Sequence, residues 1–329
     1  MIEDCTILLF THNRHILLKK NIKYYQFYFS KIIVLDSSDN SIILDKKIKY
    51  EYLPQTTFLK KLSIGIKKCT TKYFLIVPDD DFIIPYSVKK AIKFLKKNKD
   101  FVTVSGNYYY FEKHLNLIKY KKINTYKYKS IEDGSFYGRL ESLIQGHSQM
   151  VYCIFSKKLF SNFFFAFMKF YNENKLLKLT ESIITLLCIF SGKHKYINTT
   201  WMIRDGKNNN LLPKKKLINF REDEAHIQSR IFFKKNFKFL LNIFYNLYKT
   251  NVNLVKKKKL HNMFKIYFYS IKNKSKLFKK RNYFSFLLIV PQFQIILKYF
   301  FYFFFHIFRK EIFKNKDKSF IISIEKTLF

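Results

Sequence analysis

YFLIVPDDDFIIP, residues 73–85, is the most informative segment of this chain. The apolar run Tyr73–Val77 predicts a buried strand, and Pro85 is well suited to the first position of a helix. Between them stand three adjacent carboxylates, which repel one another and destabilise a fold unless something offsets their charge. A divalent cation does so, because Mg²⁺ and Mn²⁺ prefer hard oxygen ligands and commonly bind substrate phosphates as well. A solvated acidic turn is the alternative, but the strand before the acids and the helix after them favour a metal site.

The sequence around this segment alternates between short apolar runs and amphipathic stretches over residues 1–110. Apolar strands separated by helices predict a mostly parallel sheet that is covered on both faces. In such sheets, ligands bind beyond the carboxyl ends of the strands. We expect further strands at Thr6–Phe10, Ile32–Leu35 and Phe101–Ser105, and helices at His15–Phe29, Phe58–Cys69 and Ser87–Lys97.

Two further polar turns follow predicted strands in the same way. THNR, residues 11–14, follows the first strand, and DSSD, residues 36–39, follows the second. A polar turn at such a position can meet a nucleotide base or ribose, and the carboxylate of Asp36 could accept hydrogen bonds from a uracil imide or a ribose hydroxyl. The alternatives are ordinary local structure: a helix cap in the first turn and an Asx-turn in the second.

The middle of the chain has a different character. Residues 111–150 are polar and rich in Lys and Tyr, and we expect loops and an irregular insertion there. Thr180–Ser191 is apolar nearly all round, which predicts a buried helix, and His194–Asn198 predicts a strand after it. A polar linker follows, so we divide the chain into a first domain of residues 1–205 and a second region of residues 206–329.

The second region is predicted to be helical, basic and rich in Phe and Tyr. Phe284–Phe308 is about as long as a membrane span, but Lys298, Pro291 and other polar residues interrupt it. We therefore expect helices that lie on a membrane surface, with aromatic side chains inserted and Lys and Arg facing anionic lipid. A true span is the less favoured alternative. A helical cap that packs its aromatic residues on the first domain is the other.

The formal net charge of +39 suggests a nucleic-acid or membrane partner, but it has a competing explanation. A/T-rich codons specify Lys, Asn, Ile, Phe and Tyr, all of which are heavily used in this chain. Because no zinc-finger, RNP-like or basic-zipper pattern occurs, we expect no nucleic-acid partner.

Other features of the sequence exclude whole classes of function. No glycine-rich loop of the GxxxxGK[ST] or GxGxxG type occurs, which argues against P-loop NTPases and dinucleotide oxidoreductases. The four cysteines are far apart with no CxxC pair, which does not fit a zinc site and suits reduced thiols. The N-terminus has no basic n-region, so we expect no export and a cytoplasmic location.

The order of these motifs resembles that of the GT-A glycosyltransferases. Strand–THNR, strand–DSSD and strand–PDDDF–IIP–helix are similar to the pattern in the large inverting family of bacterial polysaccharide enzymes, and PDDDF resembles a subgroup associated with surface-polysaccharide synthesis. Thr180-Glu181, GKHKYI and Arg204 are similar to the acidic catalytic motif of that family and the segment after it. The resemblance therefore covers about residues 4–204. It departs from the family where Thr180-Glu181 replaces an acidic pair and where Phe58–Cys69 replaces a Gly/Asn-rich stretch.

The resemblance implies a GT-A (Rossmann-like) fold and a role for each matching residue. Glu181 would be the general base that takes the proton of the acceptor hydroxyl, with a helix-terminal carboxylate favoured by the macrodipole as the alternative. Asp80 and Asp81 would bind Mn²⁺ or Mg²⁺, which stabilises the departing diphosphate. Arg139 and Arg204 are candidate contacts to diphosphate or acceptor anions, with a structural role as the alternative. The nucleotide pocket would be lined by Thr11, Asn13, Arg14, Asp36 and Asp79.

The whole pattern predicts a metal-dependent inverting glycosyltransferase. It would move a sugar from a nucleotide-sugar donor, with UDP as the first candidate nucleotide, to a surface-glycan or lipid-linked acceptor. The basic tail would hold the enzyme on the inner face of the cytoplasmic membrane. The alternative is a non-catalytic binding protein for anionic membrane or nucleic acid on a degenerate GT-A fold, for which three adjacent carboxylates bring no advantage.

Overall fold

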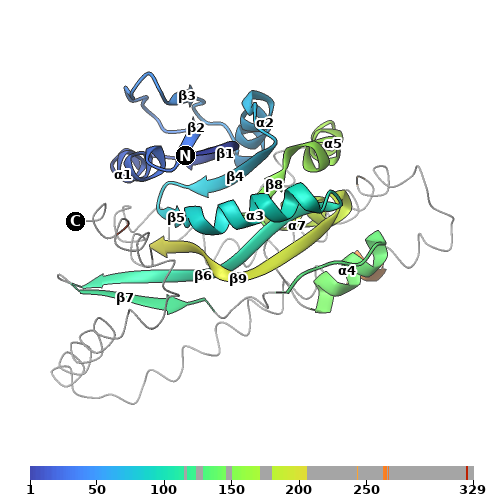
Figure 1. Ribbon diagram of the computed structural model, residues 1–329. Coiled ribbons are helices and arrows are strands. Elements are labelled where there is room, and N and C mark those ends of the chain that lie inside the picture. The colour runs from blue at the N-terminus through green and yellow to red at the C-terminus, as the bar shows by residue number, and fades with distance from the viewer. Residues whose placement is uncertain are drawn as a thin grey trace, which may run out of the picture.

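A mixed sheet with helices on both of its faces forms the body of the protein (Figure 1). This arrangement confirms the expected α/β class. The computed structural model describes residues 1–114, 117–123, 129–145, 150–170 and 180–205, and beyond them positions 243, 262–264, 266 and 324.

The first half of the sheet is parallel. It contains β1 (Ile2–Thr11), β2 (Phe29–Asp36), β3 (Lys49–Tyr52) and β4 (Tyr73–Pro78) in the spatial order β3-β2-β1-β4. Every neighbouring pair among these four strands is parallel. β1 has β2 on one side and β4 on the other, so the strand order reverses at β1. Open α/β sheets bind their ligands at such a reversal.

The second half of the sheet mixes parallel and antiparallel pairs. It contains β5 (Asp81–Ile83), β6 (Phe101–His114), β7 (Leu117–Lys122), β8 (Ile154–Ser156) and β9 (Lys193–Asp205). β6 and β9 are parallel, whereas β8 is antiparallel to both β4 and β6 and joins the two halves. β5 pairs antiparallel with β9, and β7 pairs antiparallel with β6.

Helices cover the sheet on both faces because the strand side chains alternate between two cores. Leu8 belongs to one core and its neighbour Leu9 to the other. Figure 1 shows the helices around the sheet. The core that contains Leu9 is covered by α1 (His15–Gln26) and α3 (Pro85–Lys97), and the core that contains Leu8 by α2 (Phe58–Lys68), α4 (Phe136–Gln145), α5 (Lys157–Met168) and α7 (Thr180–Ser191).

The stretch 111–150 is more regular than the sequence suggests. β6 continues to His114 and forms a hairpin with β7, and α4 follows. Phe111 and Tyr120 are cross-strand partners in this hairpin, and both are buried, with ring centroids 6.4 Å apart. Buried aromatic residues share this hairpin with several lysines, so its average composition hides the strands. The expectation of loops throughout this stretch was therefore wrong.

α7 matches the buried helix predicted from the sequence, and residues 183–190 are all buried. Gly192 then turns the chain into β9. A Cβ atom at Gly192 would lie 2.6 Å from the carbonyl oxygen of Asp100, so only glycine fits this close approach. The turn fixes the C-terminal end of α7 against the sheet, and Glu181 is exposed in the first turn at the other end.

Four of the six described residues of the tail are buried in the two cores of the sheet. Ile243, Met263 and Phe264 are buried in the core that contains Leu8. The ring of Phe264 stacks on that of Phe190 in α7, with centroids 6.4 Å apart. For these positions, the contacts favour a cap on the first domain over a surface that faces lipid.

The remainder of the tail stays a matter of prediction. Most of residues 206–329, including the expected membrane-surface segment Phe284–Phe308, lies outside the described residues. Among the helices that are described, none is long and apolar enough to cross a membrane.

Candidate active site

The carboxyl ends of β1, β2 and β4 meet at one edge of the sheet. In the strand register, Thr11 lies opposite Asp36, and Phe10 lies opposite Pro78. Asp79 follows Pro78, and its Oδ2 accepts a hydrogen bond of 2.6 Å from Thr11 Oγ1. Residues from three separate strand ends are thus in one place, at the reversal of strand order where ligands bind.

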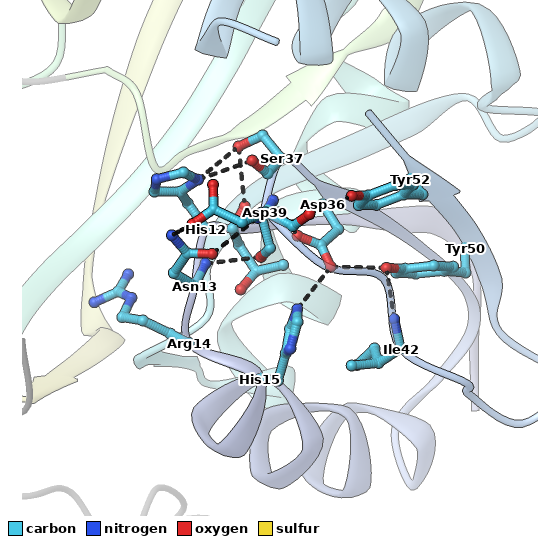
Figure 2. A network of polar contacts seen from close by, with 12 residues as sticks. His12, Asn13, Arg14, His15, Asp36, Ser37, Asp39, Ile42, Tyr50 and Tyr52 are labelled. Carbon is cyan, nitrogen blue, oxygen red and sulfur yellow. Dashed lines mark hydrogen bonds and ion pairs between the residues drawn. The ribbon is translucent and has the colours of Figure 1, made fainter. Parts of the chain in front are cut away.

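The turns that follow β1 and β2 are hydrogen-bonded to each other (Figure 2). Asn13 Nδ2 donates to Asp39 Oδ2 at 2.9 Å, and the Asp39 backbone N–H donates to Asn13 Oδ1 at 3.0 Å. The Asn13 backbone N–H also donates to Ser38 Oγ at 2.7 Å. Asn13 has a φ of 55°, in the left-handed region that asparagine tolerates better than most residues. Asn13 therefore shapes the first turn and links it to the second.

Asp36 is a fully buried carboxylate held by hydrogen bonds from three residues, Ser38, Tyr50 and His15 (Figure 2). Its Oδ1 accepts the Ser38 backbone N–H at 2.8 Å. Its Oδ2 accepts the Tyr50 hydroxyl at 2.8 Å and lies 3.0 Å from His15 Nε2. Burial acts to raise the pKa of Asp36, but the hydrogen bonds from Ser38, Tyr50 and His15 outweigh it and lower the pKa below its ordinary value. Asp36 is therefore a fixed anion at neutral pH.

The first two carboxylates of the acidic triplet share one guanidinium. Arg14 forms an ion pair with Asp79 through Nη2, and its Nη1 lies 2.7 Å from Asp80 Oδ2. Asp79 is buried, whereas the Asp80 side chain is 20% exposed. Burial raises the pKa of Asp79 to about 7, although Arg14 and Thr11 act to lower it. Asp80 is thus the member of this pair that a ligand from solvent can reach.

The third carboxylate, Asp81, points to a different partner. Asp81 lies opposite Arg204 in the β5–β9 pair, and Arg204 Nε is 3.1 Å from Asp81 Oδ2. Burial raises the pKa of Asp81 to about 8, and Arg204 only partly offsets this. The Arg204 guanidinium also lies 5.1 Å from the ring centroid of Tyr152.

Tyr152 relates Glu181 to the acidic triplet. Burial raises the pKa of the Tyr152 phenol, and the negative charge of Glu181 is the next largest cause. The charges of Arg204, Asp81 and Asp80 also act on this phenol. Glu181, which is exposed in the first turn of α7, and the acidic triplet therefore act on the same phenol. Sequence reasoning missed Tyr152, because an aromatic residue ahead of an apolar run is usually a core residue.

Lys61 is a second residue that the sequence did not reveal. It lies in α2, and it is only 5% exposed. Its Nζ donates to the Thr11 carbonyl oxygen at 3.0 Å and to Ser37 Oγ at 2.9 Å. Burial lowers the pKa of Lys61 to about 8, against the raising effect of Asp36 and Asp79. The signal was present in the helical period, since Lys61 interrupts the apolar face of α2, but one lysine is inconspicuous in so basic a chain.

Arg139 lies away from this edge of the sheet. It is buried in α4, and its Nε donates to the Ile189 carbonyl oxygen at 2.7 Å. Its Nη1 donates to the carbonyl oxygens of Asp133 and Gly134 at 3.0 and 2.9 Å. These contacts fasten a loop to the end of α7 and favour the structural alternative for Arg139.

The acidic triplet fits a divalent metal whose coordination the substrate completes. Its hard oxygen donors suit Mg²⁺ or Mn²⁺. Asp79 Oδ1 and Asp81 Oδ2 are buried without a hydrogen bond, and each has only an arginine ion pair, with Arg14 and Arg204 respectively. Among the described residues, no three His, Cys, Asp or Glu side chains are grouped as a protein cage for a metal. A site of one or two carboxylates, waters and substrate phosphates needs no such cage. Asp80 is the best-placed ligand, and Asp81 as a second ligand stays a prediction.

Comparisons with known proteins agree with this arrangement. Residues 18–164 match the family model "Glycosyl transferase family 2", a range that contains Asp36 and the acidic triplet but neither Thr11 nor Glu181. The crystal structure of residues 1–349 of TarS from S. aureus is similar in fold, with a TM-score of 0.53, 12% identity, and coverage of 88% of this chain and 77% of TarS 1–349. A longer TarS structure gives a TM-score of 0.46 at 11% identity, covering 83% of this chain and 55% of that one. Among curated proteins, no significant match is found.

Proposed function

We propose that this chain, whose residues 18–164 match the glycosyl transferase family 2 model, is a metal-dependent inverting transferase that moves a sugar from a nucleotide-sugar donor to a surface-glycan acceptor. The observation that carries the proposal is the convergence of three strand ends, with Asp36, Asp79 and Asp80 at one edge of the sheet. The charges of Glu181, Asp80 and Asp81 all act on the buried Tyr152 phenol, which supports including Glu181 in the proposed site.

The donor nucleotide would bind at the edge of the sheet beside the two hydrogen-bonded turns. Asp36 is ionised at the end of β2 and is the candidate acceptor for a hydrogen bond from a base or ribose. Thr11 and Asp79 are hydrogen-bonded to each other at the same edge. Asn13 and Arg14 lie in the turn after β1 and would border the nucleotide.

We assign stabilisation of the negative charge on the leaving group to Asp80, Arg14 and Arg204. Asp80, with Asp81 as the second candidate, would hold Mn²⁺ or Mg²⁺, which when bound stabilises the negative charge on the departing diphosphate. Arg14 contacts Asp80, and Arg204 contacts Asp81, so both guanidinium groups stand beside the place where that charge develops. Fixed cations at such a place favour the transition state over the ground state.

Glu181 is the proposed general base. Its position in the first turn of α7 favours a negative charge, because the helix macrodipole is positive at this end. An acceptor hydroxyl within hydrogen-bond reach of Glu181 would lose its proton to the carboxylate as it attacks the sugar. Attack from the side opposite the leaving diphosphate inverts the anomeric carbon. A helix-terminal carboxylate with no chemical role is the competing explanation.

The experiment that tests this function measures donor hydrolysis and transfer with Mn²⁺ or Mg²⁺ and a panel of nucleotide sugars. We expect metal-dependent release of a nucleoside diphosphate by the wild-type chain. Asp80→Asn should reduce it at least a hundredfold, whereas Asp4→Asn, which changes an exposed carboxylate at the other end of β1, should not. Undiminished turnover of Asp80→Asn would overturn the metal site, and absence of any nucleotide-sugar activity would overturn the function.

The second part of the proposal concerns the acceptor and the membrane, and it rests on the basic and aromatic composition of the chain. A chain of net charge +39 with 39 Phe and 24 Tyr suits an enzyme that meets a lipid-linked acceptor at an anionic membrane surface. Sedimentation of the full chain with vesicles tests this part. We expect binding to vesicles that contain an anionic phospholipid and none to purely zwitterionic vesicles. Equal binding to both would contradict the electrostatic attachment.

A further inference from the structure

We propose that the solvent-facing side of α1 attaches the first domain to an anionic phospholipid bilayer, with one apolar side chain inserted at each end of the helix and lysines between them. We call this surface the α1 face. It consists of Ile16, Lys19, Lys20, Lys23 and Phe27. The inference rests on the membrane part of the proposed function, and it adds a contact surface in the first domain to the one expected of the tail.

The two apolar residues of the α1 face are exposed to solvent. Ile16 is 76% exposed and Phe27 is 77% exposed. α1 ends at Gln26, and Phe27 continues its geometry with a φ of −70° and a ψ of −25°. Positions 16, 20, 23 and 27 recur with the helical period, so they lie on one side of the helix. Single exposed apolar residues are common, but two of them at the ends of one basic stripe form a pattern.

The lysines between these two residues give the face its charge. Lys19, Lys20 and Lys23 are all exposed, and α1 contains no Asp or Glu. α3, which covers the same core of the sheet, also contains no acidic residue. Its exposed lysines are Lys89, Lys90, Lys93, Lys96 and Lys97. Two basic helices on one face of the sheet complement a plane of anionic headgroups, which attracts each basic residue near it.

The exposed apolar residues distinguish a bilayer from other anionic partners. α2, on the other face of the sheet, also exposes lysines, but none of its large apolar side chains is exposed. A nucleic acid would bind lysines through its phosphates and would gain nothing from an exposed Ile16. A membrane interface takes in Ile and Phe beside Lys, because the apolar groups enter the acyl boundary while the charges stay at the headgroups. The α1 face therefore fits a bilayer.

The opposite side of α1 holds the acidic segment of the proposed site. The Tyr25 hydroxyl donates to the Asp81 carbonyl oxygen at 2.9 Å, and Asn21 Nδ2 donates to the carbonyl oxygen of Asp79. An α-helix with its side chains is about 10–12 Å across. Attachment through the α1 face would thus hold the acidic segment roughly this far from the membrane surface. Such a distance suits an acceptor whose lipid part remains in the bilayer.

Tryptophan fluorescence of the full chain tests whether the α1 face enters the bilayer. The chain has one tryptophan, Trp201, which is fully buried, so a second one at the surface can be followed above a constant background. In Phe27→Trp, phosphatidylcholine–phosphatidylglycerol vesicles with brominated acyl chains should quench the added fluorescence roughly twofold or more. Phe170→Trp is the control, because Phe170 is 44% exposed and follows α5, a helix of the other sheet face. Its fluorescence should not change.

Sedimentation with the same vesicles, without bromine, tests the charges. The test variant replaces the three lysines of the α1 face with glutamine. Its affinity for the vesicles should fall roughly tenfold to a hundredfold, since each basic residue near an anionic surface contributes about fivefold. The control variant makes the same change in charge on α2, at the exposed residues Lys60, Lys67 and Lys68. It should lose no more than about threefold, and both variants should keep the wild-type turnover of nucleotide sugar.

The other results would each overturn the inference. Vesicle binding without quenching in Phe27→Trp would place the attachment elsewhere in the chain and leave the membrane part of the proposed function standing. Equal losses in the two lysine variants would show attraction by net charge alone. Binding of a single-stranded oligonucleotide, but not of vesicles, would assign the basic face to nucleic acid and remove the membrane part as well. The transferase function is judged separately, by nucleotide-sugar turnover in the absence of vesicles.

Discussion

Arg204 lies directly opposite Asp81 across the β5–β9 pair, with its Nε 3.1 Å from Asp81 Oδ2. Asp81 is buried, and burial raises its pKa to about 8 even beside this guanidinium. The ion pair therefore compensates a carboxylate that the fold has taken out of water. It also holds the end of β9 beside the acidic triplet, 123 residues earlier in the chain.

We expect Arg204→Met to destabilise the protein, because it leaves the buried Asp81 carboxylate without its counter-ion. Loss of one partner of a buried pair costs about 3–5 kcal/mol, and partial exposure of Arg204 reduces this to about 1–3 kcal/mol. Asp81→Asn in the same background should recover most of the loss, because no buried charge then remains. Urea denaturation of the two single variants and the double variant measures the coupling, and strictly additive changes would contradict it.

Replacement of Glu181 tests the proposed general base. Glu181→Gln keeps the shape of the side chain but cannot accept a proton, so kcat should fall about a hundredfold to ten-thousandfold. Affinity for the donor nucleotide should stay within about threefold, since the base acts on the acceptor. The matched control is Glu141→Gln, at an exposed position of α4, which should retain full activity. A Glu181→Gln enzyme with more than half of the wild-type kcat would exclude this role.

The first half of the fold could be predicted because its strands carry strong apolar runs. Strands with both faces covered are apolar throughout, and this is why β1, β2 and β4 were expected near their observed places. β3, β5 and β8 have only three or four residues each, too few for a pattern to be distinct. β5 forms only because β9 pairs with it from the far end of the described chain, an interaction that local sequence does not encode.

The sequence predicted only those residues of the candidate site that lie at or directly after the ends of strands. Thr11, Asp36 and Asp79 come together because parallel strands bring their carboxyl ends to one edge. Lys61 and Tyr152 enter the site from other elements, and their roles depend on burial, which a single sequence does not reveal. The sequence also could not show which way each of the three adjacent acids points. Tertiary contacts decide this, because Arg14 pairs with Asp79 and Arg204 pairs with Asp81.

Two substitutions of Asn13 distinguish the contribution of its side-chain hydrogen bonds to stability from the cost of its left-handed backbone conformation. Asn13→Gly keeps the left-handed φ of 55° at no steric cost but loses the hydrogen bonds to Asp39. Asn13→Ala loses the same bonds and also takes on the cost of a left-handed residue, about 1–2 kcal/mol. Urea denaturation should therefore show Asn13→Ala to be the less stable by about 1 kcal/mol. Equal stability of the two variants would mean that the turn relaxes out of its left-handed conformation.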